Sequence, residues 1–236
     1  FVGAGYKNIG YENLDLSFVQ GIPVPAPAAG SNCFYGTDWV VLRSSFTSVD
    51  YSKYRLTVDP RQHAVRSVFI CGGGSDPQDL TWLAITALLR YGSPHTVILA
   101  LLGRYYSGKA RGFRRQNVCI QHDGTDLVPL PSLMRMCGAA IVSYGMTALE
   151  CLAVGLPTIV LSMSEDHNNS AAALAGQGAL VNAGLIAAAT QQSLAARYDS
   201  LCNNPALCAK LSVTGRRLID GRGVQRVADK IMEVIT

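Results

Sequence analysis

The sequence predicts an α/β fold, a Rossmann-like parallel sheet with helices on both faces. From about residue 65, short runs rich in aliphatic and β-branched residues alternate with segments of helical period. Such alternation indicates βαβ units with right-handed crossovers. Two of the runs end in Gly-rich turns, as strands do where they lead into helices. Hydrophobic residues make up 49% of the 236 residues, which suits a sheet buried on both faces.

The elements follow in order along the chain. Strands are expected at 67–71, 96–102, 117–122, 139–143 and 157–162, with a short one near 179–181. Helices are expected from about 78 to 90, from 130 to 136, after Gly145, and from 167 to 176. The remainder, from about 191 to 235, reads as three helical pieces separated at Pro205 and at the Gly221–Gly223 turn.

The first 60 residues follow a different pattern. Residues 21–32 are rich in Pro, Gly and Ala and read as a loop, 37–43 read as a strand, and 51–62 as a polar connector. Nothing in this region makes a self-sufficient core. We therefore expect residues 1–43 to be the tail of an N-terminal domain that begins upstream, 44–62 to be a linker, and 63–236 to be a C-terminal domain.

Composition narrows the functional class. Twenty Lys and Arg against sixteen Asp and Glu leave a net charge of +4, weaker than is usual for nucleic-acid binders. The seven cysteines form no CxxC pair or metal-spaced cluster, so no metal or cofactor is expected and a reducing cytoplasm is the simpler environment. Cys71, Cys119 and Cys151 lie in apolar runs and are expected in the interior. With no signal peptide and no uninterrupted apolar stretch of about 18 residues, the chain is expected to be soluble and cytoplasmic.

Two Gly-rich turns are candidate phosphate sites. Residues 72–77 (GGGSDP) follow one strand and residues 143–147 (SYGMT) follow another. In each turn glycine lets the backbone approach a ligand, and the next helix is expected to present free N–H groups. Two such turns in one sheet suit a diphosphate. The alternative is that both are ordinary tight turns, with Asp76 an N-cap.

Glu150 is the single acid in the apolar segment 143–162. An unpaired carboxylate is costly there, so a partner is required. About one turn into its helix, it lies where the vicinal hydroxyls of a ribose can donate to both its oxygens. Stabilisation by its own helix N-terminus is the alternative.

Other polar groups are less specific. The segment SEDHNN (164–169) follows a strand and suits either a polyol or an N-capped loop. His122 and Asp123 end another strand, where a lone His is more often a packing residue. The basic run from Arg104 to Arg115 could attract phosphate, but a solvated loop is the favoured expectation. GxSxG, HExxH, P-loop and GxGxxG motifs are all absent from the sequence.

Four stretches together resemble a known family: YGTDWVVLRSSF, GGGSDPQDLT, LPSLMRMCGAAIVSYGMTALECLAVGLPTIVLSMSEDHNNSAAAL and LIDGRGVQRV. They are similar to the C-terminal part of the pseudaminic-acid-pathway UDP-sugar hydrolases and spore-coat polysaccharide proteins, relatives of the MurG-like GT-B glycosyltransferases. The resemblance covers most of residues 33–230 and implies the C-terminal, nucleotide-binding domain of a GT-B fold.

The resemblance also implies roles for individual residues. A diphosphate would contact the turns at Gly73, Gly74 and Ser75 and at Gly145, Met146 and Thr147. Glu150 would take the ribose hydroxyls, and the segment from Ile120 to His122 would lie along the uracil. The sugar would face Glu165, Asp166, His167 and Asn168.

On this basis we expect a UDP-sugar hydrolase of surface polysaccharide synthesis, with a GT-B glycosyltransferase or a non-catalytic nucleotide-sugar-binding module as alternatives. The family's base is a His in a G-x-G-H loop of the N-terminal domain, and the sequence has no such loop. The catalytic base is therefore expected upstream, with His167 as the candidate within this chain. The chain by itself is expected to turn over substrate poorly. The residues after Glu165 also depart from the family pattern, which leaves the sugar undefined.

Overall fold

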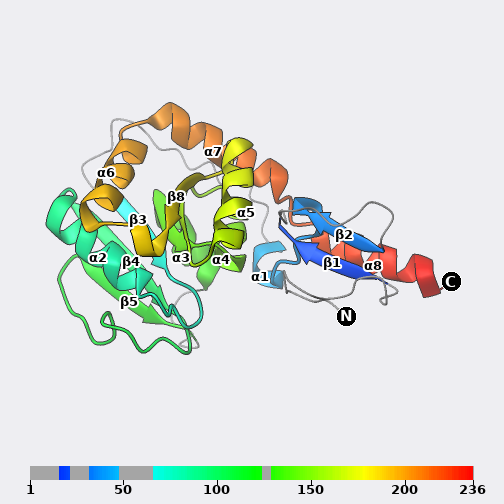
Figure 1. The fold of residues 1–236 in the computed structure, drawn as a ribbon, viewed down its shortest axis with the longest axis horizontal. Helices are drawn as coiled ribbons and strands as arrows, with labels where there is room; N and C mark the ends of the chain where they lie inside the picture. The colour runs from blue at the N-terminus through cyan, green and yellow to red at the C-terminus, as the bar shows by residue number, and fades with distance from the viewer. Residues whose placement is uncertain (1–15, 22–31, 48–65, 124–128, 236) are drawn as a thin grey trace.

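A computed structural model describes residues 16–21, 32–47, 66–123 and 129–235. Within it, a large unit is built on a six-stranded sheet, and a smaller group of elements lies beside it (Figure 1). The six strands are β3 (Arg66–Cys71), β4 (Thr96–Leu102), β5 (Val118–His122), β6 (Ala139–Ser143), β7 (Thr158–Ser162) and β8 (Val181–Leu185).

All neighbouring strands of this sheet are parallel, in the order β5-β4-β3-β6-β7-β8. The expected α/β fold with a parallel sheet is therefore confirmed. The strand order reverses between β3 and β6, and open parallel sheets bind ligands beyond the carboxyl ends of the strands at such a switch point. The carboxyl ends of β3 and β6 are therefore the expected location of a ligand-binding site.

Helices cover both faces of the sheet. The cluster on one face includes residues of α2 (Leu80–Tyr91) and α6 (Gln191–Cys202). The cluster on the other face includes residues of α3 (Leu130–Arg135), α4 (Met146–Val154) and α5 (Glu165–Gly176). Helix α7 (Pro205–Leu218) packs against both α4 and α6. Because both faces are covered, the central strands are mostly apolar, which is why they stand out in the sequence.

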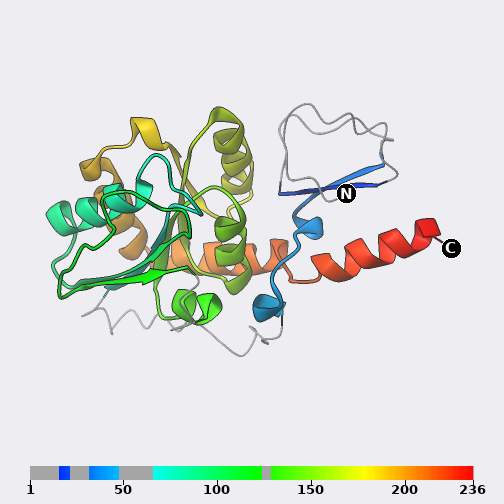
Figure 2. The ribbon, with the colours of Figure 1, turned by 90° about the horizontal axis from the view of Figure 1, so that it is seen from below.

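The smaller group contains both the beginning and the end of the described chain (Figure 2). Strands β1 (Ser17–Gln20) and β2 (Cys33–Gly36) pair in parallel, and the 3₁₀ helix η2 (Thr37–Trp39) follows. The rings of Phe18, Phe34 and Trp39 cluster with centroids 4.9–5.5 Å apart.

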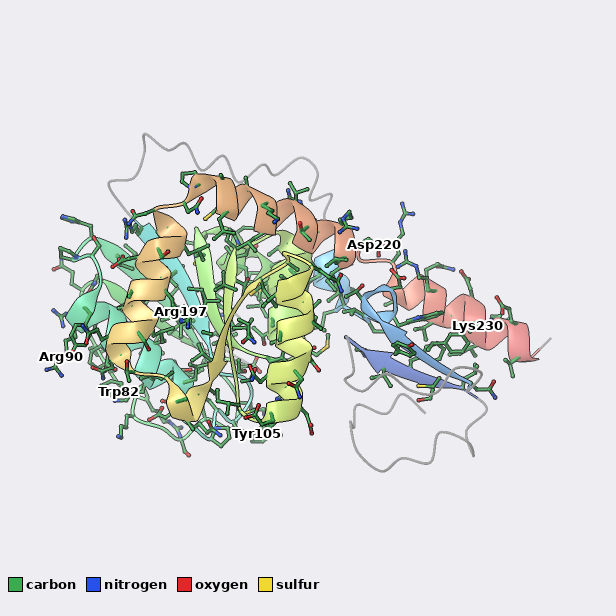
Figure 3. The ribbon with its side chains drawn as sticks, turned by 45° about the horizontal axis from the view of Figure 1, so that its top comes forward. Trp82, Arg90, Tyr105, Arg197, Asp220 and Lys230 are labelled. Atoms are coloured by element: carbon green, nitrogen blue, oxygen red, sulfur yellow. The ribbon has the colours of Figure 1, made fainter. Side chains whose placement is uncertain are left out.

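Helix α8 (Gly223–Ile235) joins this group rather than the large sheet. Arg226 donates to the carbonyl of Asp38 at 3.2 Å, and the ammonium of Lys230 lies 5.2 Å from the Phe34 ring centroid (Figure 3). Gly223 packs so closely on the backbone of Val40 that a Cβ would overlap it. The last helix thus holds the segment around η2 from the other end of the chain.

The strand predicted at 37–43 is wrong. Residues 37–39 form η2, and Val40 to Arg43 belong to no strand or helix. Val40 and Leu42 are buried in the α4-side cluster while Val41 is only half-buried. The apolar residues that indicated a strand therefore pack on a helix-covered core without forming one.

The domain boundaries stay predictions. A short helix, α1 (Ser44–Thr47), falls within the expected linker 44–62. The predicted loop 21–32 and connector 51–62 lie almost wholly outside the described residues.

The limits of two helices and one strand differ from those predicted. Helix α2 begins two residues late because Asp76 and Asp79 before it have φ of 43° and 54°. Helix α5 begins two residues early because Ser164 caps it. Strand β8 lies later than the predicted 179–181.

The expectation for Cys119 is also wrong. This residue is exposed on β5, a strand at the edge of the sheet, whereas Cys71 and Cys151 are buried as expected. Within the described part of the chain, no helix is long and apolar enough to span a membrane.

Cysteine accessibility gives a direct test of this arrangement. Burial raises the pKa of the Cys71 thiol to about 11 and that of Cys137 to about 12, which suppresses the reactive thiolate. A thiol reagent at neutral pH is expected to label Cys119 first and the buried cysteines only on unfolding. Peptide mapping after brief labelling checks this. Persistence of the fast phase in Cys119→Ser would contradict the strand assignment.

Candidate functional site

A cavity of about 260 Å³ lies at the switch point between β3 and β6. Its walls are the two Gly-rich turns together with Met163, which follows β7. All six residues predicted to hold a diphosphate line it: Gly73, Gly74, Ser75, Gly145, Met146 and Thr147. The tertiary structure thus brings together two turns that are about 70 residues apart in the sequence.

The turn after β3 is closed by Asp76. This side chain is only 5% exposed, and its two carboxylate oxygens accept from the backbone N–H groups of Leu80 and Thr81, both at 2.8 Å. The carboxylate lies against Gly72, where any Cβ would overlap it. The first N–H groups of α2 are therefore already satisfied, and the expectation that this helix end offers free donors is wrong. Asp79, not Asp76, occupies the N-cap position of α2, so the alternative of Asp76 as a plain N-cap is wrong, although its side chain does cap the first N–H groups of the helix.

The same turn is held in place by its neighbours. The hydroxyl of Ser143, at the end of β6, donates to the carbonyl of Gly72 at 2.9 Å. The N–H of Tyr105 donates to the carbonyl of Gly74 at 2.9 Å. Gly103 approaches the Gly73–Gly74 backbone so closely that a Cβ would overlap it. Strands on both sides of β3 thus fix the backbone that lines the cavity.

The turn after β6 is built differently, and its helix end is open. Helix α4 begins at Met146, and Gly145 at its N-cap position has φ of 153° and makes no side-chain capping bond. The space beside Gly145 is empty within 4 Å of where a Cβ would stand. The first N–H groups of a helix lack intrahelical partners, and the dipole places partial positive charge there. This end of α4 therefore has the chemistry that suits an anion, and its contact with a diphosphate stays a prediction.

Glu150 lies on α4 one turn beyond that end, and its side chain is 4% exposed. Its partner is Arg43, from the segment that follows η2. The guanidinium donates from Nε at 2.9 Å and lies at 2.8 Å through Nη2. Both contacts are made to Oε1, so among the described residues Oε2 is left to accept from another donor.

Electrostatics at Glu150 reflect this environment. Burial raises the pKa of the Glu150 carboxyl above its ordinary value. The charge and hydrogen bonds of Arg43 oppose that rise, and the nearby Asp123 adds to it. Arg43 therefore binds one oxygen of the carboxylate, Oε1. Contact of the other oxygen, Oε2, with a ribose stays a prediction.

The predicted sugar-binding residues form the first turn of α5. Ser164 caps this turn by accepting from the N–H of His167 at 3.4 Å, as the N-capped-loop alternative requires. Asn168 donates to Glu165 at 3.3 Å. These four residues, Asp166 included, are not among those lining the 260 Å³ cavity, but the His167 ring lies 5.6 Å from that of Tyr144, which does line it. Their contact with a sugar stays a prediction.

The end of β5 is separate from this cavity. Ile120 packs against the α2-side cluster. His122 lines a second cavity of about 500 Å³ together with Arg104, Arg111 and Arg114. Part of the basic run expected in a solvated loop thus surrounds a concave surface. The predicted contact of Ile120 and His122 with uracil stays a prediction.

Arg43 is the residue that sequence reasoning missed. It lies 107 residues from Glu150, so no local spacing connects the two. The available signal was indirect: a buried acid requires a cation, and Arg43 ends the apolar run from Trp39 to Leu42.

Comparison with known proteins supports the fold. No family model matches the chain. It is 26% identical over 225 residues to the spore coat polysaccharide biosynthesis protein SpsG of Bacillus subtilis, covering 94% of this chain and 65% of that protein.

Two solved structures share the architecture. MurG of Acinetobacter baumannii superposes with a TM-score of 0.60 at 18% identity, covering 93% of this chain and 60% of MurG. The spinosyn rhamnosyltransferase SpnG complexed with thymidine diphosphate gives 0.56 at 20% identity, covering 70% of this chain and 45% of SpnG. The fold is that of GT-B glycosyltransferases, and the chain spans less than two thirds of each of these proteins.

Proposed function

We propose that this chain supplies the donor-binding part of a glycosyltransferase that uses a nucleoside diphosphate sugar in polysaccharide synthesis. The observation that carries the proposal is the cavity at the β3–β6 switch point, with the uncapped end of α4 on one wall and Glu150 one turn deeper. A diphosphate is the anionic group that suits a helix N-terminus beside Gly-rich backbone. The similarity to SpsG supports a role in polysaccharide synthesis.

The chemistry follows from what the cavity can stabilise. An acceptor hydroxyl attacks the anomeric carbon of the sugar, and the bond from that carbon to the β-phosphate oxygen breaks. The bonding electrons leave with the nucleoside diphosphate, whose growing negative charge is stabilised by the N–H groups and dipole at the start of α4. The proton of the hydroxyl passes to a general base.

The base is not assigned by the cavity walls. In the family that the sequence resembles, the base is a His of a G-x-G-H loop, and this sequence has no such loop. Within the chain, His167 is the candidate, because its ring lies beside Tyr144 at the cavity. Contact between His167 and the reacting atoms is part of the proposal.

A hydrolase would use the same donor site with water in place of the acceptor hydroxyl. Incubating the full-length protein with UDP-glucose and with thymidine diphosphate glucose, each with and without a polysaccharide primer, separates the two. We expect nucleoside diphosphate release that depends on the primer. Stoichiometric release of free glucose without primer would contradict transfer and establish the hydrolase.

Binding without turnover is the third outcome. Calorimetric titration of the same protein with both nucleotide sugars measures it. Tight binding with no release of nucleoside diphosphate under any condition would contradict catalysis and favour a binding module. Failure to bind either nucleotide sugar would contradict the assignment of the cavity itself.

A further inference from the structure

The guanidinium of Arg43 and the carboxylate of Glu150 form an ion pair one helical turn beyond the end of α4 that lines the cavity. Both donor contacts converge on Oε1, at 2.9 Å and 2.8 Å. The Glu150 side chain is 4% exposed, while that of Arg43 is 57% exposed and also lies 5.7 Å from the Phe46 ring centroid. The acid is therefore fixed inside the core and the cation reaches it from the surface.

We propose that Arg43 is a positioning residue of the nucleotide site, which holds Oε1 of Glu150 and so presents Oε2, in charged form, to a sugar hydroxyl of the nucleoside. This inference rests on the proposed function and revises its detail. The ribose contact expected from the sequence used both carboxylate oxygens, and the geometry assigns one of them to Arg43.

The charge of Glu150 depends on Arg43. A carboxylate taken out of water becomes protonated unless a cation or several donors hold it in the charged form. A protonated carboxyl keeps its carbonyl oxygen but loses the negative charge that makes hydrogen bonds from a hydroxyl strong. Arg43 is the cation next to Glu150, so the accepting power of Oε2 depends on it.

Asp123, which follows β5, opposes ionisation of Glu150 because its negative charge raises the pKa of that carboxyl. Cys71 at the end of β3 and Cys151 on α4 also lie near Glu150, but burial raises the pKa of both thiols and keeps them neutral. None of these is a cation at neutral pH.

Two basic side chains on the helices packed against α4 bond to groups other than Glu150. Arg135 donates to Pro131 and Ser132 within α3. Arg216 on α7 donates to Ser212 and lies beside Gly155, at the other end of α4. Among the described residues, Arg43 is the cation bonded to Glu150.

Arg43 also fixes the orientation of the Glu150 carboxylate. Two donors on one rigid, planar group constrain both the position and the rotation of the carboxylate. Lysine carries the charge but not this fork, so the two substitutions Arg43→Met and Arg43→Lys separate charge from orientation. Glu150→Gln removes the titrating group itself and serves as the matched control.

The test measures the affinity of the full chain for UDP-glucose by calorimetry as a function of pH. The phosphates of a nucleotide sugar carry no proton that titrates near neutrality, so a midpoint in the profile belongs to the protein. Affinity requires the ionised carboxylate and is lost as pH falls through the pKa of Glu150. Because Arg43 lowers that pKa, Arg43→Met is expected to move the midpoint upward by about one pH unit or more, a tenfold or larger loss at pH values between the two midpoints.

The variants have distinct expected profiles. Arg43→Lys is expected to lie between wild type and Arg43→Met, and Glu150→Gln to bind weakly with no midpoint. If Arg43→Met does not fold, Arg43→Lys alone decides the matter, since an unmoved midpoint in that variant overturns the proposal. Equal weakening at every pH would mean that Arg43 is merely structural, and would also overturn it.

A second measurement needs no ligand. A carboxyl whose pKa is raised in the folded state stabilises the protein below its unfolded pKa, and that contribution is lost as pH rises through the folded pKa. Unfolding in urea is expected to show a larger loss of stability with rising pH in Arg43→Met than in wild type, and no such difference in the Glu150→Gln background. Wild-type failure to bind UDP-glucose contradicts the proposed function, whereas wild-type binding with an unmoved midpoint contradicts the role of Arg43 alone.

Discussion

Replacing Met146 by glutamate is expected to weaken nucleotide-sugar binding by about 10- to 1000-fold while leaving the fold as stable as before or slightly more stable. Met146 is the first residue of α4, is 40% exposed and lines the 260 Å³ cavity. A carboxylate at a helix N-terminus interacts favourably with the dipole, by roughly 0.3–1 kcal/mol. The same carboxylate repels a diphosphate by roughly 1 to 3 kcal/mol per phosphate charge at a few ångströms in a partly solvated site.

Met146→Glu is expected to lower the affinity for the nucleotide sugar without lowering the free energy of unfolding. General damage to the fold would lower both. Titration with UDP-glucose gives the affinity, and urea unfolding gives the free energy of unfolding. Met146→Gln has the same length without the charge and is expected to bind within about threefold of wild type. Equal affinities for the Glu and Gln variants would show that the start of α4 does not face the diphosphate.

Replacing Asp76 by alanine is expected to lower the free energy of unfolding by about 2 to 4 kcal/mol. The change removes the acceptor of two buried N–H groups at the start of α2. It also places alanine at φ of 43°, which an Asp or Asn tolerates better because its short side chain can bond locally. Loss of the side chain further leaves a gap over Gly72.

The control for this prediction is Asp76→Asn. Asparagine keeps one acceptor oxygen and the tolerance for positive φ, and loses the charge that interacts with the dipole of α2. A loss of about 1 kcal/mol is expected. Both values come from the urea dependence of the far-ultraviolet circular dichroism. An alanine variant as stable as the asparagine variant would mean that water satisfies the two N–H groups, and that the cap contributes little.

Much of the fold is readable from the sequence, because the signals are local. Strands β3, β4, β6 and β7 are largely apolar runs with a glycine or proline beside one end, and β4 and β6 match their predicted limits. A strand that is covered on both faces needs apolar side chains on both faces, so such runs are visible in the sequence. The segment around Val40 shows the limit of that reasoning, since an apolar run indicates burial but not whether a ladder partner exists.

The two Gly-rich turns look alike in the sequence but differ in the structure. Both follow strands and both precede helices. In one, Asp76 occupies the helix end, and in the other the end of α4 is open. The difference arises because the carboxylate of Asp76 reaches the start of α2. The backbone conformation of Asp76 and Asp79 and the absence of a side chain at Gly72 allow this position.

The sequence by itself determined the parallel α/β architecture, the two turns and the isolated acid at Glu150, because each depends on residue type and short-range spacing. Only the tertiary structure decided which helix end is free to bind an anion, and that Arg43 holds Oε1 of Glu150. These contacts join residues far apart in the chain, so no local pattern encodes them. The sequence indicates that the buried Glu150 requires a partner, but which residue is the partner depends on how the segment after η2 packs on α4.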